Sequence, residues 1–469
     1  MLLFTYIQFI SKRSSQDLKS VNTLREQQIT EGDVNSSPIR KDWHERNGHP
    51  AAEELLERDS AVFLHQELST PCLDSIRTAD GTIIELESGR KLLDFHGNNV
   101  HNLGFAHPKL KKALTEQLQS LTFSTRRYTN RTAVELAEKL TSYSPSLNRI
   151  LFVPGGAEVV GLALKVARVV TGRYKVISMW DSFHGATLGA SSVSGVASFT
   201  KGVGPLLTGV EHAAPPNPTE CPFRCGSRCS MQCAGYIEYM IRKQGDVGAV
   251  LAETIRSAPV IPPPEYWKEV RKICDRHGVL LILDEIPHAL GRTGKIFTFQ
   301  NYGIEPDMVL LGKGLGGGML PFAALLAKDQ FNQQVKTLSL GHYTHEKNPL
   351  SSAVALRLLQ VIEEENLLDH VEEMHRFSMN ELKKIKENHA WVSDIRGLGL
   401  ILGVELRNPD TGHKALDLSE KVMYRSNELG LNFKLSMGNI INLAPPINVR
   451  IEELRKAFSV IDQALGELS

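Results

Sequence analysis

Three short apolar runs constrain the fold of this 469-residue chain more than any other feature. They are VGAVLAE (247–253), VLLILDE (279–285) and DMVLLGK (307–313). Strands that lack polar alternation are buried on both faces, which is typical of a parallel sheet covered by helices. A helical pattern, EYWKEVRKICDRHG (265–278), separates the first two runs and ends at a glycine. This order predicts an α/β fold built on a parallel sheet.

The segments around these runs divide the chain into regions. RILFVP (149–154) and KVISMW (175–180) predict two more strands, with a helix over 157–171 between them. After residue 350 the pattern changes to a long helix followed by the short strands LILGVEL (400–406) and IINLAPP (440–446). We therefore expect a large domain over 96–350 and a smaller α+β domain over 351–469. Residues 51–95 are expected to join the small domain, and residues 1–50 to form an N-terminal arm.

Charge and hydropathy exclude some classes of partner. Lys plus Arg number 53 and Asp plus Glu number 53, so no overall charge attracts nucleic acid or an anionic membrane. The apolar run at residues 1–10 is too short to span a bilayer and lacks the flanks of a signal peptide. We expect no nucleic-acid partner, no membrane partner and a cytoplasmic location.

Four of the six cysteines are evenly spaced in ECPFRCGSRCSMQC (220–233), at Cys221, Cys225, Cys229 and Cys233. Zinc sites prefer pairs spaced C-x2-C, whereas this segment has three C-x3-C steps. Disulfides would require an oxidising compartment, which no other feature indicates. A loop with reduced thiols is the better interpretation, metal or redox use stays an alternative, and we predict no metal.

Polar residues stand where the predicted strands end. Glu253, Asp284 and Lys313 each close an apolar run, and GGAE (155–158) links a strand to the start of a helix. A strand-end aspartate is often a helix cap, and a strand-end lysine is often solvated. Because ligands bind beyond the carboxyl ends of parallel strands, however, these residues are expected to converge in one site.

This set matches the needs of pyridoxal phosphate. The cofactor requires a lysine amine for its aldehyde, a carboxylate for its ring nitrogen, and N–H donors at a helix start for its phosphate. Lys313 and Asp284 supply the first two, and Gly156 and Ala157 supply the donors. Phe183 is predicted to lie against the ring face. GRTGK (291–295) does not fit a nucleotide-binding loop, so pyridoxal 5'-phosphate is the expected cofactor.

The chain also resembles the class III (ω-) aminotransferases, which are fold-type I pyridoxal-phosphate enzymes. The segments that carry the resemblance are LLDFHGNNVHNLGFAHP (92–108), FVPGGAEVVGLALKVAR (152–168), SFHGATLGA (182–190), LLILDEIPHALGRTGKIF (280–297), LLGKGLGGGMLP (310–321) and YTHEKNPLSSAVAL (343–356). The resemblance implies a mostly parallel seven-stranded sheet, a smaller α+β domain and a homodimer with shared active sites. It further implies that Thr344 reaches the phosphate held by the neighbouring subunit, that Glu253 supports the aspartate, and that His184 joins the cofactor site.

Three positions depart from the family pattern. GGA (155–157) lacks the hydroxyl residues of most relatives, and Pro287 stands where relatives usually have glutamine. Asn442 stands where many carboxylate-processing relatives place an arginine. A transaminase must bind the carboxylate of an oxo acid, for which bidentate arginine is the usual group. An enzyme that needs no amino acceptor escapes this requirement.

Some members of the family are lyases, and GGAE, DEIPHALGRTGK and CPFRCGSRC most resemble that branch. The resemblance implies an ammonia-lyase acting on the R form of 1-hydroxy-2-aminoethylphosphonate in phosphonate catabolism, giving phosphonoacetaldehyde and ammonia. Lys313 is then the proton-transferring amine and Asp284 the electrostatic partner of the ring. Four arginines are candidates for binding the phosphonate of this small amine substrate: Arg126, Arg127, Arg256 and Arg292.

Two alternatives remain open at this stage. One is an aminotransferase that moves an ω-amino group to pyruvate or 2-oxoglutarate. The other is a non-catalytic binding or scaffold protein on the same fold. Retention of both Lys313 and Asp284 argues against the second alternative.

Overall fold

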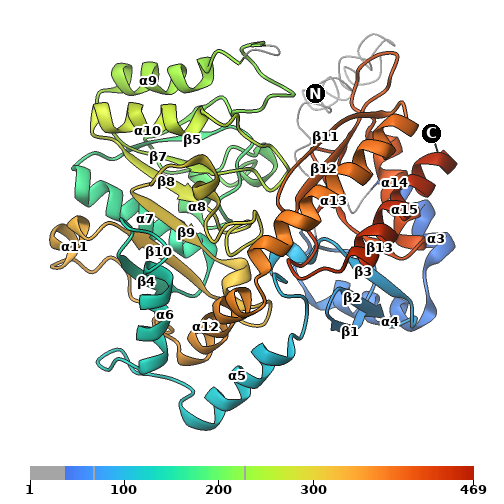
Figure 1. Cartoon of the computed structure of the whole chain (residues 1–469), viewed down its shortest axis with the longest axis horizontal. Helices are drawn as coiled ribbons and strands as arrows, with labels where there is room; N and C mark the ends of the chain where they lie inside the picture. Colours follow the sequence, from blue (N-terminus) through green and yellow to red (C-terminus); the bar gives the residue numbers. More distant parts are fainter. Residues whose placement is uncertain (1–36, 67–68, 226–228, 469) are drawn as a thin grey trace, which may run out of the picture.

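The structure is a computed structural model that describes residues 37–66, 69–225 and 229–468. Most of the predicted N-terminal arm, residues 1–36, therefore lies outside the described residues. From residue 38 the chain is helical rather than extended, in α3 (Pro38–Asn47) and α4 (Pro50–Val62). Ser37 caps α3 through the Arg40 N–H, and a proline opens the helix. Buried Trp43 stacks on Tyr424 with ring centroids 5.3 Å apart, which attaches α3 to the C-terminal helix α14 (Leu416–Glu428) (Figure 1).

The predicted central sheet is present and has seven strands in the order β4-β10-β9-β8-β7-β5-β6. These strands are β4 (Arg149–Val153), β5 (Lys175–Met179), β6 (Val210–Ala213), β7 (Val247–Glu253), β8 (Leu280–Asp284), β9 (Met308–Leu311) and β10 (Ala323–Ala327). The pairs from β6 to β9 are parallel, and β10 runs antiparallel to both of its neighbours. The predicted α/β class with a mostly parallel sheet is confirmed.

Successive side chains of the central strands point to opposite faces of the sheet, and both faces are covered, which explains why these strands are almost wholly apolar. In β7, Ala249 and Leu251 pack in the core cluster that contains α7 (Gly156–Thr171). Their neighbours Val250 and Ala252 pack in the other cluster, with α9 (Gln232–Gln244) and α10 (Tyr266–His277). Both faces of the strand are therefore buried, so a polar side chain is accommodated only where the strand ends.

Helices at the lower end of the large sheet form a second layer (Figure 1). Helix α12 (Pro349–Glu364) packs on α5 (Pro108–Ser120) and α6 (Arg131–Thr141). Two short helices, α8 (Leu188–Val193) and α11 (Gln330–Val335), pack on α7 instead. The chain leaves this layer through α13 (Leu367–Asn388), which contacts β11 and α15 in the C-terminal part.

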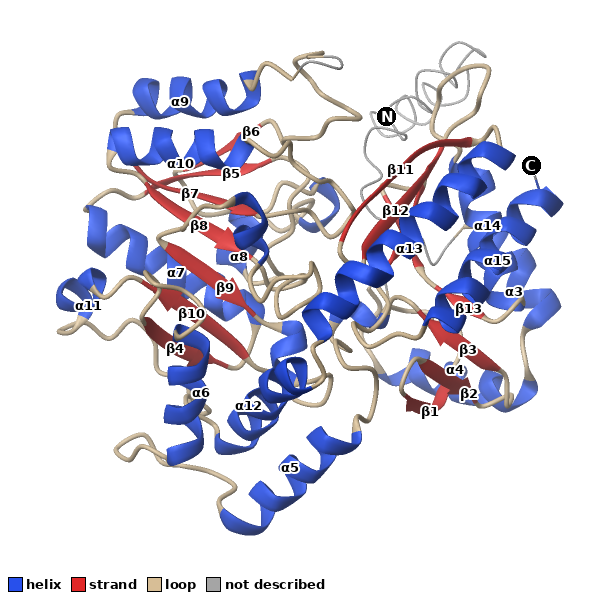
Figure 2. Ribbon diagram, viewed as in Figure 1, coloured by secondary structure: helices blue, strands red, loops and turns tan. Residues whose placement is uncertain are grey.

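Two smaller sheets lie beside the large one (Figure 2). The first is antiparallel and contains β11 (Val392–Leu398), β12 (Ile401–Leu406), β15 (Ile440–Leu443) and β14 (Lys434–Ser436), next to α15 (Ile451–Leu468). The second contains β1 (Ile76–Asp80), β2 (Ile83–Leu86), β3 (Lys91–Asp94) and β13 (Leu431–Asn432). Strand β3 pairs with β13 in parallel, so the segment at 76–94 is attached to the C-terminal part. A large parallel sheet with a smaller α+β unit is the fold-type I architecture.

The cysteine loop carries free thiols, and so do Cys72 and Cys274. Cys233 is buried at the start of α9, whereas Cys229 is exposed. Within the described residues, no three His, Cys, Asp or Glu side chains are grouped so that they could hold a metal ion. None of the helices in that part of the chain is both long and apolar enough to cross a membrane.

Candidate active site

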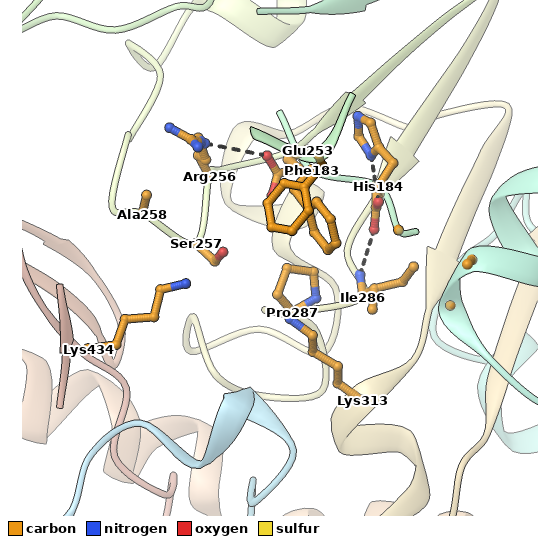
Figure 3. Close-up of a pocket in the computed structure, with 15 residues that line it drawn as sticks. Phe183, His184, Glu253, Arg256, Ser257, Ala258, Ile286, Pro287, Lys313 and Lys434 are labelled. Atoms are coloured by element: carbon orange, nitrogen blue, oxygen red, sulfur yellow. Dashed lines mark hydrogen bonds and ion pairs between the residues drawn. The ribbon is translucent and has the colours of Figure 1, made fainter. Parts of the chain in front are cut away.

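A cavity of about 440 Å³ opens at the carboxyl edge of the large sheet (Figure 3). This volume lies in the range of small-molecule sites. Eight of the predicted site residues line it: Gly156, Ala157, Phe183, His184, Glu253, Arg256, Asp284 and Lys313. They come from five separate segments of the sequence, and the sheet topology brings them together.

Asp284 ends β8 and is buried, with two donors on its carboxylate. Its Oδ2 lies 2.7 Å from Nδ1 of His184, and its Oδ1 accepts the N–H of Ile286 at 3.0 Å. His184 is also buried, and its backbone N–H donates to the Ser194 hydroxyl at 2.9 Å. The carboxylate is thus fixed in orientation at the cavity wall, and His184 acts by positioning it.

The glycines around Lys313 are explained by close packing. A Cβ at Gly312 would lie 3.0 Å from Cγ2 of Ile286, and one at Gly314 would lie 2.7 Å from the Asn102 side chain. Lys313 itself has a backbone φ of 41°, in the left-handed region that non-glycine residues rarely adopt. Strained backbone of this kind is typical of functional sites.

The start of α7 lies on the cavity wall and could hold an anion. Gly155 caps the helix without a side-chain hydrogen bond, so first-turn N–H groups at Gly156 and Ala157 are available to a ligand. Gly185 has a φ of 124°, and a Cβ there would lie 2.8 Å from Cβ of Ala157. Glycine therefore allows the loop that carries Phe183 and His184 to approach the helix closely. A phosphate fits this site, a ring fits beside Phe183, and a ring nitrogen fits against Asp284.

Glu253 and Arg256 form a buried pair on the same wall. Their side chains are 7% and 10% exposed, with Nε of Arg256 4.0 Å from Oε2 of Glu253. Burial raises the pKa of Glu253 to about 7, although Arg256 opposes this shift. Nη1 of Arg256 is buried and has no hydrogen-bond partner among the described residues. This guanidinium lines the cavity and is one of the four candidate arginines.

Arg292, another candidate, lies outside the cavity lining. Its guanidinium is buried and donates to the Pro445 carbonyl at 2.6 Å and to Oδ1 of Asn102 at 2.9 Å. Burial lowers the pKa of Arg292 to about 10. These contacts give Arg292 a role in joining chain segments.

The remaining predicted residues lie together on the surface. Arg126 and Arg127 are exposed in the 121–130 loop, and Thr344 is exposed in the 341–348 segment. The two segments touch, because the Phe123 and His345 ring centroids are 5.5 Å apart. These three residues are not among those that line the cavity of their own chain.

A smaller cavity of about 170 Å³ adjoins the first and contains residues that sequence reasoning missed. The two cavities share Ser257, Lys313 and Lys434. Lys434 lies on a three-residue strand that carries no motif. It is the cross-strand partner of Asn442, the position already marked by its departure from the family pattern. The pairing of those two strands is the signal that would have identified Lys434.

The strand-end lysine, the buried carboxylate and the helix-start anion site define a pyridoxal-phosphate enzyme of fold-type I. Residues 65–465 match the family described as Aminotransferase class-III, and the chain belongs to that family. This confirms the predicted resemblance, and pyridoxal phosphate is the cofactor.

Individual relatives differ in their reactions. The chain is 46% identical over 457 residues to (R)-1-hydroxy-2-aminoethylphosphonate ammonia-lyase of Vibrio splendidus, covering 94% of this chain and 95% of that protein. It is 33% identical to leucine/methionine racemase of Thermococcus litoralis, covering 89% and 96%. Among solved structures, the ω-transaminase of Pseudomonas jessenii in complex with PMP has a TM-score of 0.83 and 27% identity, covering 88% and 98%. Family membership alone therefore does not define the reaction.

Proposed function

We propose that the protein is a pyridoxal-phosphate-dependent ammonia-lyase that converts (R)-1-hydroxy-2-aminoethylphosphonate to phosphonoacetaldehyde and ammonia. The observation that carries the proposal is 46% identity, over nearly the whole of both chains, to a protein with that named activity. The reaction removes water from the substrate and then adds water to the released enamine, so the atoms balance without an oxidant or an amino acceptor.

The residues of the cavity have distinct tasks in this reaction. Bound pyridoxal phosphate supplies an electron sink that acidifies the proton beside the substrate amine. The free Lys313 amine would take that proton and deliver it to the departing hydroxyl group, which leaves as water. Asp284 provides the negative charge opposite the ring nitrogen, and His184 keeps that carboxylate in place.

The environment of Asn442 favours elimination over transamination. Its amide is buried and donates to the Ser257 carbonyl at 2.5 Å and to the Ser436 hydroxyl at 3.2 Å. A neutral amide does not replace a guanidinium as a carboxylate-binding group. Elimination needs no oxo acid, so the loss of an arginine here is tolerated. Transamination remains the second candidate, because the similar solved structures include several transaminases.

We also propose that the enzyme works in the cytoplasm as a homodimer and serves phosphonate catabolism. The exposed patch formed by the 121–130 loop and the 341–348 segment supports the dimer, because its polar residues lie outside their own cavity. Thr344 of this patch would then contact the phosphate held by the partner subunit. The free thiols support a reducing compartment.

A turnover assay tests the proposed reaction. Purified protein loaded with pyridoxal phosphate is incubated with the hydroxylated amine in the absence of any oxo acid, and ammonia is measured. Sustained release over many turnovers is expected. No ammonia release, with the cofactor left as pyridoxamine phosphate after one turnover and alanine formed only when pyruvate is added, would replace the lyase by the aminotransferase. Absence of any absorbance from bound cofactor would favour the non-catalytic alternative.

A further inference from the structure

We propose that Lys434 and Arg256 together form the subsite for the doubly charged oxyanion of the substrate, at the end of the cavity opposite the start of α7. This inference rests on the proposed function for the identity of the substrate. It assigns substrate specificity to Lys434 of the C-terminal sheet, which lines the same cavity as Arg256, a residue just after strand β7 of the large sheet.

Lys434 is placed by strand pairing to reach the reaction cavity. Its strand β14 pairs with β15, with Lys434 opposite Asn442, and both residues line the smaller cavity. Lys434 also lines the larger one. Figure 3 shows its side chain extending toward Ser257, while Lys313 reaches the same cavity beneath Pro287. A cation thus stands on the strand next to a neutral amide, within reach of a molecule held near Lys313.

The two ends of the cavity bind different anions in this arrangement. A Cβ on Gly156 would lie 3.2 Å from Cδ1 of Ile286, so the start of α7 lies on the Ile286 side. In Figure 3, Ile286 and Lys434 lie on opposite sides of the cavity. The cofactor phosphate belongs at the first end. A substrate whose amine is bound near Lys313 then directs its tail toward Lys434.

The second end is electropositive and polar. Nη1 of Arg256 is buried without a hydrogen-bond partner in the described part of the chain, which suits it to an oxyanion. Polar side chains line the adjoining 170 Å³, including His96, Asn98 and Asn99. Burial, followed by the positive charge of Lys434, lowers the pKa of His96 to about 4, so this histidine is neutral at neutral pH and the positive charge of this end comes from Lys434 and Arg256. Two cations facing one small volume match a dianion better than a single carboxylate charge.

The test replaces Lys434 and compares substrates that differ only in the tail. Lys434→Ala is expected to lower kcat/KM for 1-hydroxy-2-aminoethylphosphonate by about 100-fold, mainly through KM. Lys434→Arg is expected to recover most of the loss. With 2-aminoethanol, which has no anionic tail, the variants should stay within about 3-fold of the wild type. Isoserine, the carboxylate analogue, should be the poorer substrate for the wild type, and this preference should disappear in Lys434→Ala.

A matched control and a binding measurement separate this inference from the proposed reaction. Lys421, exposed on α14, is replaced by alanine as the control. Binding of methylphosphonate to the cofactor-loaded protein is measured by calorimetry, which requires no turnover. Weaker binding to Lys434→Ala alone supports the subsite even if no ammonia is ever released. The inference is overturned if Lys434→Ala binds methylphosphonate like the wild type, or if its activity falls equally on 2-aminoethanol.

Discussion

Glu253 lines the cavity, and its protonation state changes the charge there. Burial raises its pKa to about 7, with Asp284 contributing in the same direction. The nearby cations, Arg256 and Lys313, and the His184 ring act in the opposite direction. Glu253 is therefore neutral below pH 7 and increasingly ionised above it.

This titration predicts a pH-dependent KM. Below about pH 7, Glu253 is neutral, so the positive charge of Arg256 is available to the substrate oxyanion. Above about pH 7, the Glu253 carboxylate pairs with Arg256 and repels the anionic tail of the substrate. We expect KM for the phosphonate to rise by up to about 10-fold between pH 6 and pH 8 in the wild type. In the Glu253→Gln variant, KM should change with pH only as much as ionisation of the substrate's own phosphonate requires. An unchanged profile in Glu253→Gln, measured against 2-aminoethanol as the tail-free control, would contradict this assignment.

At this scale, the sequence predicted the cavity residues that end buried strands or lie in recognisable motifs, and it missed Lys434, which does neither. Asp284 alone could have been a helix cap, and it was the expected convergence of Glu253, Asp284 and Lys313 at one edge of the sheet that indicated a site. Lys434 lies on a short strand at the border of two sheets, where a lysine is usually a solvated surface residue. Only the pairing with Asn442 brings it to the cavity, and that pairing is a tertiary property.

At the scale of elements, Arg292 connects segments that are far apart in the sequence. Its two hydrogen bonds join the loop after β8 to the Pro445 carbonyl beyond β15 and to Asn102 before α5. Asn102 in turn donates to the Leu290 carbonyl at 3.1 Å. The guanidinium thus holds the C-terminal segment against the large sheet.

Arg292→Ala is therefore expected to reduce stability rather than substrate affinity. It removes a buried side chain and leaves the Pro445 and Asn102 oxygens without their donor, so the free energy of unfolding should fall by about 4 kcal/mol. Urea unfolding followed by circular dichroism measures the change. Arg242→Ala, an exposed position on α9, should alter stability by less than about 0.5 kcal/mol. Normal stability with a selective loss of phosphonate binding would instead make Arg292 a substrate residue.

The elements of the large sheet were predictable because their periodicity and composition agree with their burial. Helix α3 was not, because only Arg40 and Trp43 of its ten residues are buried and the rest reads as a polar arm. Its helical state depends on the Ser37 cap, the opening proline and the contact of Trp43 with Tyr424. The local sequence pattern did not distinguish a helix from an extended arm, and the packing of Trp43 favours the helix.

At the scale of the whole molecule, the surface patch with Arg126, Arg127 and Thr344 predicts shared active sites. The protein should elute as a species of twice the 52.0 kDa chain mass. Thr344→Ala should weaken cofactor binding by about 10-fold, because a hydroxyl donor to the phosphate is lost. A mass of one chain, or unchanged cofactor affinity in Thr344→Ala, would contradict the shared site.

Mixed dimers make the same prediction sharper. A hybrid dimer of one Lys313→Ala chain and one Thr344→Ala chain has one intact site. That site takes Lys313 from the Thr344→Ala chain and Thr344 from the Lys313→Ala chain. Random reassociation of equal amounts should therefore restore about one quarter of wild-type activity at limiting cofactor. No gain over the unmixed variants would mean that Thr344 serves its own subunit or neither.

The central claim is that Lys313 is the lysine that binds pyridoxal phosphate. Borohydride reduction of the loaded enzyme makes this bond permanent, and mass spectrometry of the digested protein identifies the labelled residue. Lys434 lines the same cavity and provides an internal comparison. The structure predicts the cofactor mass on the peptide that contains Lys313 and none on the peptide that contains Lys434. A label on Lys434, or on a lysine outside the cavity, would contradict the account.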